Sequence, residues 1–293
     1  MKVFYSPKFV AGAFGFETTR KAAWVADSLR MVPIEGVVLV EPELVSESLL
    51  LRVHHAEYVQ AIKTGLPRAL AESHDLQWDP GFWTMVRASN GGVVAAALAA
   101  LKDGVAGSLS SGLHHARRAT GEGYCTFNGL VLAAQAALDQ GAKRVLILDL
   151  DAHCGGGTAE LVAHYGNAIH HIDLAVDSYD RYMTISPHSL DLVEDASEYI
   201  ARLLERLDHL PNSYDLCLYN AGMDPYEGCP TGGLKGITED VLRVREQLVF
   251  STFRGRGIPV AFVLAGGYVG QRLDQSMLVD LHRLTIQAAM HLL

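Results

Sequence analysis

The fold of this chain is most constrained by an alternation of short, almost wholly apolar runs with longer helical patterns. Three of the short runs, VLILDL, DLCLYN and PVAFVL, are apolar at nearly every position. Strands that are buried on both faces have this character, because neither side of the sheet meets water. Strands are therefore expected at residues 3–5, 37–40, 105–109, 145–150, 169–174, 216–220 and 259–264.

The helical patterns fill the intervals between these strands. They cover residues 18–30, 79–101, 127–139, 158–164, 190–207, 238–253 and 272–293. Strands that alternate with helices form βαβ units, which predicts a three-layer α/β/α fold with a mostly parallel central sheet. No linker rich in Pro, Gly or Ser divides the sequence, and it contains no internal repeat. Residues 1–293 are therefore expected to form a single domain.

The composition excludes several classes of protein. Hydrophobic residues make up 49% of the 293 positions and charged residues 19%, which suits a large buried core and not a disordered chain. The net charge of −9 argues against broad electrostatic binding to nucleic acid or to a membrane surface. The N-terminal residues lack the apolar core of a signal peptide, the apolar run 91–101 is too short to span a bilayer, and the four Cys form no CxxC pair. A soluble, cytoplasmic protein is expected.

Polar and glycine-rich segments follow four of the predicted strands. These segments are SSGLHHA, LDLDAHCGGG, NAGMDP and AGGY. Ligands of open parallel sheets bind beyond the carboxyl ends of the strands, so the four segments are expected to line one crevice.

The second of these segments has the residue types of a metal site. Asp149, Asp151 and His153 are two residues apart, so an extended strand places them on one face. Buried charges need a cation or a partner, although an Asp that caps the next helix is an alternative here. Asp224 follows another apolar strand and is a candidate further ligand, although Asp-Pro is also typical of turns. Two Asp and one His leave room for water, as in catalytic zinc sites.

Two further features suit hydrolysis of an amide. His114 and His115 follow a strand, and an imidazole of near-neutral pKa is a suitable general base, although adjacent His residues are often only solvated or structural. Tyr268 in AGGY carries a phenol that can donate to a developing oxyanion, although a glycine turn with a packed ring has the same sequence.

Taken together, SSGLHHA, GYCTFNG, VLILDLDAHCGGGT, NAGMDPYEGCPTGGLKGIT and LAGGY resemble the zinc-dependent histone deacetylases and their bacterial relatives, the acetylpolyamine amidohydrolases and acetoin-utilisation-type proteins. The motifs occur in the family's order, from about residue 106 to residue 268. The resemblance implies an arginase/deacetylase-like fold. It also implies a zinc-dependent amidohydrolase that removes an acetyl or other acyl group from acyl-lysine, an acylated polyamine or a small amide.

The resemblance also assigns catalytic roles. Asp151, His153 and Asp224 match the ligands of one zinc ion, for which Fe²⁺ and Co²⁺ are alternatives. His115 matches the general base and acid, and Tyr268 matches the tyrosine that polarises the scissile carbonyl.

Other matches surround this centre. His114 matches the neighbouring His that an Asp at the position of Asp149 supports, and the family often binds potassium near that Asp. Gly123 and Tyr124 match the pair that lines the acyl-lysine tunnel. Residues 176–183 are expected to form the other wall, through Tyr179 or Tyr182.

The sequence departs from the family at several positions. Gly156 stands where relatives have the Asp or Asn that orients the catalytic His, so His115 is expected to lack its usual partner unless water or another side chain replaces it. Residues 111–113 replace bulky residues before the His pair, and Asp173 replaces a Ser.

Two other functions are weighed against a deacetylase. Arginases and agmatinases share the Asp-Ala-His motif of residues 151–153. Their site for two manganese ions needs a further Asp soon after this His and a pair of Asp residues near position 224, whereas here Cys154 and glycines follow His153 and Asp224 stands alone. A catalytically weak or inactive relative would bind a metal and sense acylated amines without turnover, and Gly156 favours it. The substrate, the acyl chain and the oligomeric state, a homo-oligomer included, stay open.

Overall fold

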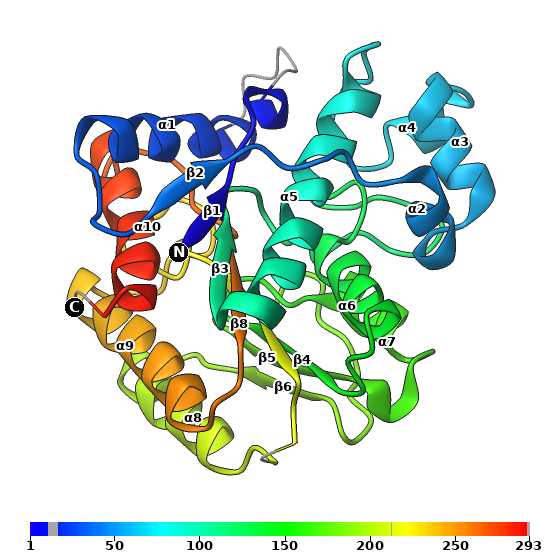
Figure 1. Ribbon diagram of the computed structural model, residues 1–293. Coiled ribbons are helices and arrows are strands. Elements are labelled where there is room, and N and C mark those ends of the chain that lie inside the picture. Colours follow the sequence, from blue (N-terminus) through cyan, green and yellow to red (C-terminus); the bar gives the residue numbers. More distant parts are fainter. Residues whose placement is uncertain (11–16, 212, 292–293) are drawn as a thin grey trace.

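A sheet of eight parallel strands forms the centre of the protein, in a computed structural model that describes residues 1–10, 17–211 and 213–291 (Figure 1). The order across the sheet is β2-β1-β3-β8-β7-β4-β5-β6, and every pair of neighbours runs in parallel. The strands are β1 (Lys2–Phe4), β2 (Val38–Val40), β3 (Val105–Ser108), β4 (Val145–Asp149), β5 (Ile169–Ala175), β6 (Ser189–Leu192), β7 (Leu216–Ala221) and β8 (Val260–Leu264).

Helices cover both faces of this sheet, which confirms the expected three-layer architecture. Figure 1 shows α1, α8, α9 and α10 on one face and α5, α6 and α7 on the other. The α-helices are α1 (Glu17–Met31), α2 (Glu47–Val53), α3 (Ala56–Thr64), α4 (Arg68–Ala71), α5 (Phe82–Asp103), α6 (Gly129–Asp139), α7 (Gly156–Val162), α8 (Ala196–Asp208), α9 (Glu239–Gly255) and α10 (Gln275–Ala289), and the short 3₁₀ helices are η1 (Pro7–Val10) and η2 (Gly166–Ala168).

The apolar strands divide their side chains between two hydrophobic clusters, one on each face. Leu146 and Leu148 of β4 belong to the cluster beneath α1, α8, α9 and α10. Val145 and Ile147 belong to the cluster beneath α5 and α6. Because successive side chains of a strand point to opposite faces, a strand with apolar residues throughout fills both layers at once.

One predicted helix is partly wrong. The pattern at residues 190–207 predicts a continuous helix, but residues 189–192 form β6, which pairs with β5, and α8 begins at Ala196. Asp195 caps that helix by accepting a hydrogen bond from the amide of Ser197. The predicted helix at 272–293 also starts late, after the N-cap Asp274, and residues 292–293 lie outside the described part.

Helix α5 is long and apolar enough to cross a membrane by length and composition alone. It packs against α6 and β3 instead, and residues such as Asn90, Val93 and Ala97 are buried there. This packing accounts for its apolar composition, as in the core helix of a soluble protein.

A buried polar network on α9 supports the ends of the central strands. Arg245 is fully buried, and its Nε and Nη2 donate to Glu246 Oε1 over 2.9 and 2.7 Å. The same Glu246 oxygen accepts from Tyr219 Oη of β7 at 2.7 Å, and Arg245 Nη1 donates to the carbonyl of Leu150 at 3.2 Å. The network therefore connects α9 to Leu150, which follows β4, and to Tyr219, which lies within β7.

Glu246→Gln should lower the free energy of unfolding by about 3 kcal/mol, because it leaves the Arg245 charge buried without its counter-charge. Denaturant titration measures this loss. The matched control is Glu239→Gln on the same helix, whose exposed side chain pairs with the partly exposed Arg243, and it should cost less than about 1 kcal/mol. Equal losses in the two variants would contradict this account of the network.

Candidate active site

The four polar segments meet at the carboxyl ends of β3, β4, β7 and β8, as the topology predicts. Strands β4 and β7 are neighbours, and Asp149 is paired in register with Asn220. This pairing brings the residues that follow each strand, Asp151 and Asp224, to the same edge of the sheet. Strand β8 lies on the other side of β7 and delivers Gly266 and Tyr268 there.

Three predicted ligands converge at this edge. His153 Nδ1 lies 3.1 Å from Asp151 Oδ1 and 3.1 Å from Asp224 Oδ2, and one donor atom from each residue lies within 4.8 Å of the other two. All three side chains are buried, and Asp224 Oδ2 has no hydrogen-bond partner among the described residues. Two carboxylate oxygens and an imidazole nitrogen are a common ligand set for zinc, so these residues fit a divalent cation.

The backbone orients both carboxylates. Asp151 Oδ2 accepts from the amide of Gly266 at 2.7 Å, and Asp224 Oδ1 accepts from the amide of Ala152 at 3.0 Å. One oxygen of each carboxylate is thereby fixed by the backbone, and the other oxygen, Asp151 Oδ1 or Asp224 Oδ2, lies 3.1 Å from His153 Nδ1. A Cβ atom at Gly266 would lie 1.9 Å from Asp224 Oδ2 and 2.6 Å from Asp151 Oδ2, so only glycine lets the two carboxylates approach there.

The electrostatics of these residues also suit a cation. Burial lowers the pKa of His153, but the two neighbouring carboxylates outweigh burial and raise the pKa to about 11. Burial and the charge of Asp151 raise the pKa of Asp224 to about 6. The carboxylates therefore attract positive charge to this point, and a divalent cation would supply it.

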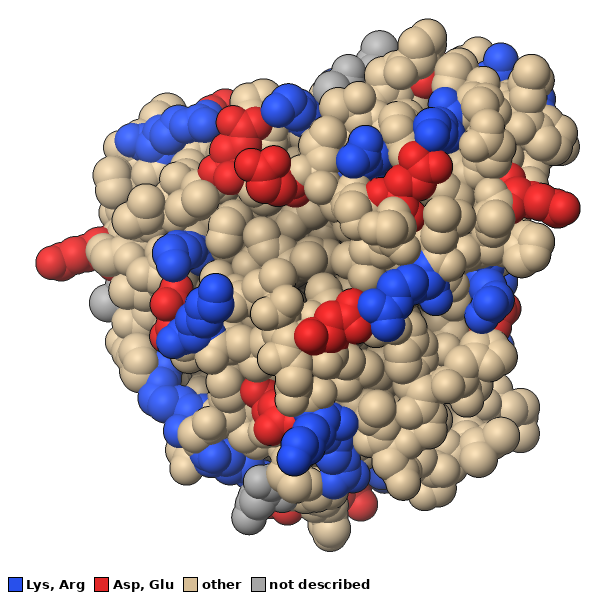
Figure 2. Space-filling model, turned by 45° about the vertical axis from the view of Figure 1, so that its right-hand side comes forward, with Lys and Arg blue, Asp and Glu red and all other residues tan. Residues whose placement is uncertain are grey.

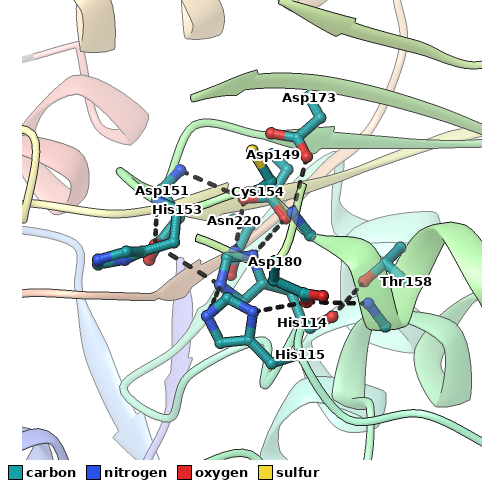
Figure 3. Close-up of polar contacts among 12 residues, drawn as sticks. His114, His115, Asp149, Asp151, His153, Cys154, Thr158, Asp173, Asp180 and Asn220 are labelled. Carbon is teal, nitrogen blue, oxygen red and sulfur yellow. Dashed lines mark hydrogen bonds and ion pairs between the residues drawn. The ribbon is translucent and has the colours of Figure 1, made fainter. Parts of the chain in front are cut away.

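The two adjacent His residues lie beside this centre and form a chain of polar contacts (Figure 3). His114 Nδ1 is 2.8 Å from Asp149 Oδ2, and its Nε2 is 3.1 Å from His115 Nε2. Burial opposes a charge on His114, yet Asp149 and Asp151 raise its pKa to about 10. Burial and this neighbouring charge lower the pKa of His115 to about 4. His115 is therefore a neutral imidazole near pH 7, as a general base must be.

Another side chain replaces the partner that Gly156 cannot supply to His115. Asp180 Oδ2 lies 2.9 Å from His115 Nδ1, and its side chain is 1% exposed. Asp180 belongs to the loop between β5 and β6, outside the family motifs, which is why sequence reasoning missed it. Of the alternatives left open by the sequence, water or another side chain, the structure shows the side chain.

A cavity of about 350 Å³ opens onto the candidate metal site. Of the two tyrosines that the sequence offers for the cavity wall, Tyr179 lines the cavity. Tyr182 does not, and its Oη donates to Asp173 Oδ2 at 3.1 Å. The cavity is lined by Asp75, His115, Gly123, Tyr124, His153, Asp177, Tyr179, Thr231 and Tyr268. Asp75, Asp177 and Thr231 are not predicted from the sequence as lining residues. Asp75 lies outside the motifs, and Asp177 and Thr231 lie in the wall segment 176–183 and in the motif around Asp224 without a spacing that marks them.

Tyr268 shares this cavity with His153, one of the three candidate ligands. Its ring centroid lies 6.4 Å from that of His153. Burial and the charges of Asp224 and Asp151 raise the pKa of the Tyr268 phenol well above its ordinary value. The phenol therefore keeps its proton and is a hydrogen-bond donor at every physiological pH.

The chain is matched from residue 16 to residue 284 by the model of the histone deacetylase domain. It belongs to the histone deacetylase family. Membership confirms the resemblance seen in the motifs and makes the chain an enzyme of the deacetylase and amidohydrolase class.

Individual relatives agree with this assignment. An uncharacterised protein of Picosynechococcus sp. is 33% identical over 265 residues, which are 87% of each chain. Histone deacetylase 2 of Arabidopsis thaliana is 30% identical over 252 residues, 80% of this chain and 65% of that protein. The crystal structure of an acetylpolyamine aminohydrolase from Burkholderia pseudomallei shares the fold, with a TM-score of 0.80 at 18% identity over 100% of this chain and 99% of that one.

Gly266→Ala should weaken zinc binding by about tenfold or more, because the new methyl group displaces the Asp224 and Asp151 carboxylates. Competition against a chromogenic chelator measures the affinity. Gly255→Ala is the matched control, since a Cβ there meets nothing within 4 Å, and it should bind zinc like the wild type. Unchanged affinity in Gly266→Ala would show that these carboxylates do not form the metal site.

Proposed function

We propose that this deacetylase-family chain hydrolyses the amide bond between an acyl group and an amine, with one zinc ion held by Asp151, His153 and Asp224. The observation that carries the proposal is the convergence of these three buried donors beside a cavity that is lined by His153, a neutral His115 and a protonated Tyr268. Each of the groups that amide hydrolysis requires is thus within one site.

Zinc, when bound, would supply the Lewis acid that polarises the amide carbonyl and acidifies water. His115 takes a proton from the attacking water as the new C–O bond forms. When the C–N bond breaks, His115 returns this proton to the amine nitrogen, so that a carboxylic acid and an amine leave. His114, supported by Asp149, lies with its Nε2 3.1 Å from His115 Nε2, and the attacking water takes the place of this contact when His115 acts as the base.

Tyr268 acts on the amide, whereas His115 acts on the water. Its phenol donates a hydrogen bond to the carbonyl oxygen, on which negative charge grows in the transition state. The raised pKa of this phenol ensures that the proton is present.

We further propose that the substrate is an elongated acylated amine, either an acyl-lysine or an acylated polyamine. Tyr124 and Tyr179 form aromatic walls that suit an aliphatic chain, with Gly123 between them and His115. Two carboxylates, Asp75 and Asp177, also line the cavity and favour a substrate with a positive charge away from the amide. On the face that Figure 2 presents, acidic and basic side chains lie next to each other, and the net charge of −9 disfavours nucleic acid.

A panel of substrates tests the proposed reaction. Zinc-loaded protein is incubated with an acetyl-lysine peptide, longer acyl-lysine peptides, acetylated polyamines and simple acetamides, and the released acid is measured. We expect release from at least one elongated amide, with loss of activity on addition of a chelator or a hydroxamate. Metal binding without release from any substrate would instead support the inactive sensor. Gly156 was the observation that favoured a sensor, and the contact of Asp180 with His115 weighs against it, because His115 has a carboxylate partner after all.

We also propose that residues 1–293 act as one catalytic domain in the cytoplasm, and that a monovalent cation such as potassium binds near Asp149. The buried Asp173 supports the second point. It lies opposite Asp149 in the register of β4 and β5, and its Oδ1 has no hydrogen-bond partner among the described residues.

Tyr268→Phe should lower kcat about 10²–10³-fold, because it removes one donor to the oxyanion. Steady-state kinetics on the preferred substrate of the panel measures the change. Tyr165→Phe, which removes a hydroxyl bonded to Gln135 outside the cavity, is the control and should leave kcat unchanged. Near wild-type turnover in Tyr268→Phe would remove Tyr268 from this role.

A further inference from the structure

Asp180 has the contacts of a built-in partner for His115. Its Oδ2 lies 2.9 Å from His115 Nδ1 and also accepts from the amide of Gly157 at 3.2 Å, and its Oδ1 accepts from Arg117 Nη2. The carboxylate is thus held by three donors and is 1% exposed, although it lies on a loop. Figure 3 shows this carboxylate beside the imidazole of His115.

The space that Asp180 occupies exists because residue 156 is glycine. A Cβ atom at Gly156 would lie 2.2 Å from Asp180 Oδ1 and 2.5 Å from the Asp180 carbonyl oxygen. Any side chain at position 156 would therefore push the loop, and the carboxylate with it, away from His115. The absence of a side chain at position 156 is therefore what allows the Asp180 carboxylate to reach His115.

The loop that carries Asp180 is fixed to the segment of the candidate ligands. The amides of Val176 and Asp177 both donate to the carbonyl of Ala152 at 2.8 Å, and the amide of Cys154 donates to the carbonyl of Tyr179 at 3.0 Å. Asp180 itself has a φ of +58°, a left-handed conformation that costs free energy in a residue other than glycine. A strained backbone that is held by several contacts is common at functional sites.

We propose that Asp180 is the positioning residue of the general base: it accepts a hydrogen bond from His115 Nδ1–H and thereby keeps the imidazole proton off Nε2, the nitrogen that takes the proton of water. The inference rests on the proposed function of this site. It assigns the support of the base to a loop that also carries Tyr179, a wall of the substrate cavity. In the reaction, Asp180 would stabilise the imidazolium that forms when His115 takes the proton.

Asp180→Asn tests the inference with the least change of shape, because asparagine is isosteric and tolerates a left-handed backbone. All three groups that contact Asp180 are donors, so one of them must face the new amide NH₂. The guanidinium of Arg117 attracts the amide oxygen, and the NH₂ group is then left against His115 Nδ1. His115 Nδ1–H then has no acceptor, so the proton is no longer held on that nitrogen.

We expect Asp180→Asn to lower kcat by about 10²-fold or more, with KM changed less than about threefold and one zinc per chain retained. The matched control is Glu160→Gln, which also removes a carboxylate next to Arg117, 3.5 Å from its Nη1, but does not touch His115. The control should keep wild-type kcat. An Asp180→Asn variant with wild-type kcat, or an equal loss in both variants, would overturn the inference while the proposed function stands.

A second readout does not depend on activity. Proton–nitrogen correlation spectra of wild-type protein should show a downfield, slowly exchanging His115 Nδ1 proton, assigned by its absence in His115→Ala. The signal should persist in Glu160→Gln and disappear in Asp180→Asn. A wild-type His115 without this Nδ1 proton, or a signal unchanged in Asp180→Asn, would contradict the inference even if no substrate of the enzyme were found.

Discussion

The site depends on the convergence of two carboxylates and one imidazole at a single buried point. Unpaired charges at such a position are costly, by several kcal/mol each. The chain must therefore hold the two carboxylates in a fixed orientation, and the carboxylates need a cation between them. The orientation comes from the amides of Ala152 and Gly266 and from the lack of a side chain at Gly266. The order of the strands makes this possible, because β4, β7 and β8 are neighbours and end at the same edge.

Much of this arrangement is readable in the sequence, because it follows from local periodicity and parallel topology. The two-residue spacing of Asp149, Asp151 and His153 at the end of an apolar strand predicts one group of ligands. The position of Asp224 after a second apolar strand predicts its approach to them, which the neighbouring strands β4 and β7 provide. Strand β6 is not readable in this way, because its half-buried SLDL pattern at residues 189–192 runs directly into the amphipathic pattern of α8.

Asp180 shows why the rest of the site could not be predicted. Its approach to His115 depends on a left-handed backbone at residue 180, on the contacts of the loop with Ala152 and Cys154, and on the open space at Gly156. None of these has a periodic signal, and the loop lies outside the family motifs. Transfer of the family's roles position by position marks residue 156 as changed, but it does not indicate that Asp180 contacts His115 instead.

The central claim is that Asp151, His153 and Asp224 together bind one divalent ion, and the number of ions per chain tests it most directly. Protein is loaded with zinc, freed of excess metal by gel filtration, and measured by mass spectrometry of the metal alongside Asp224→Asn. The account predicts about one ion per chain in the wild type and much less in the variant, since each ligand is needed for a three-ligand site. Two ions per chain, or one ion retained fully in Asp224→Asn, would contradict it.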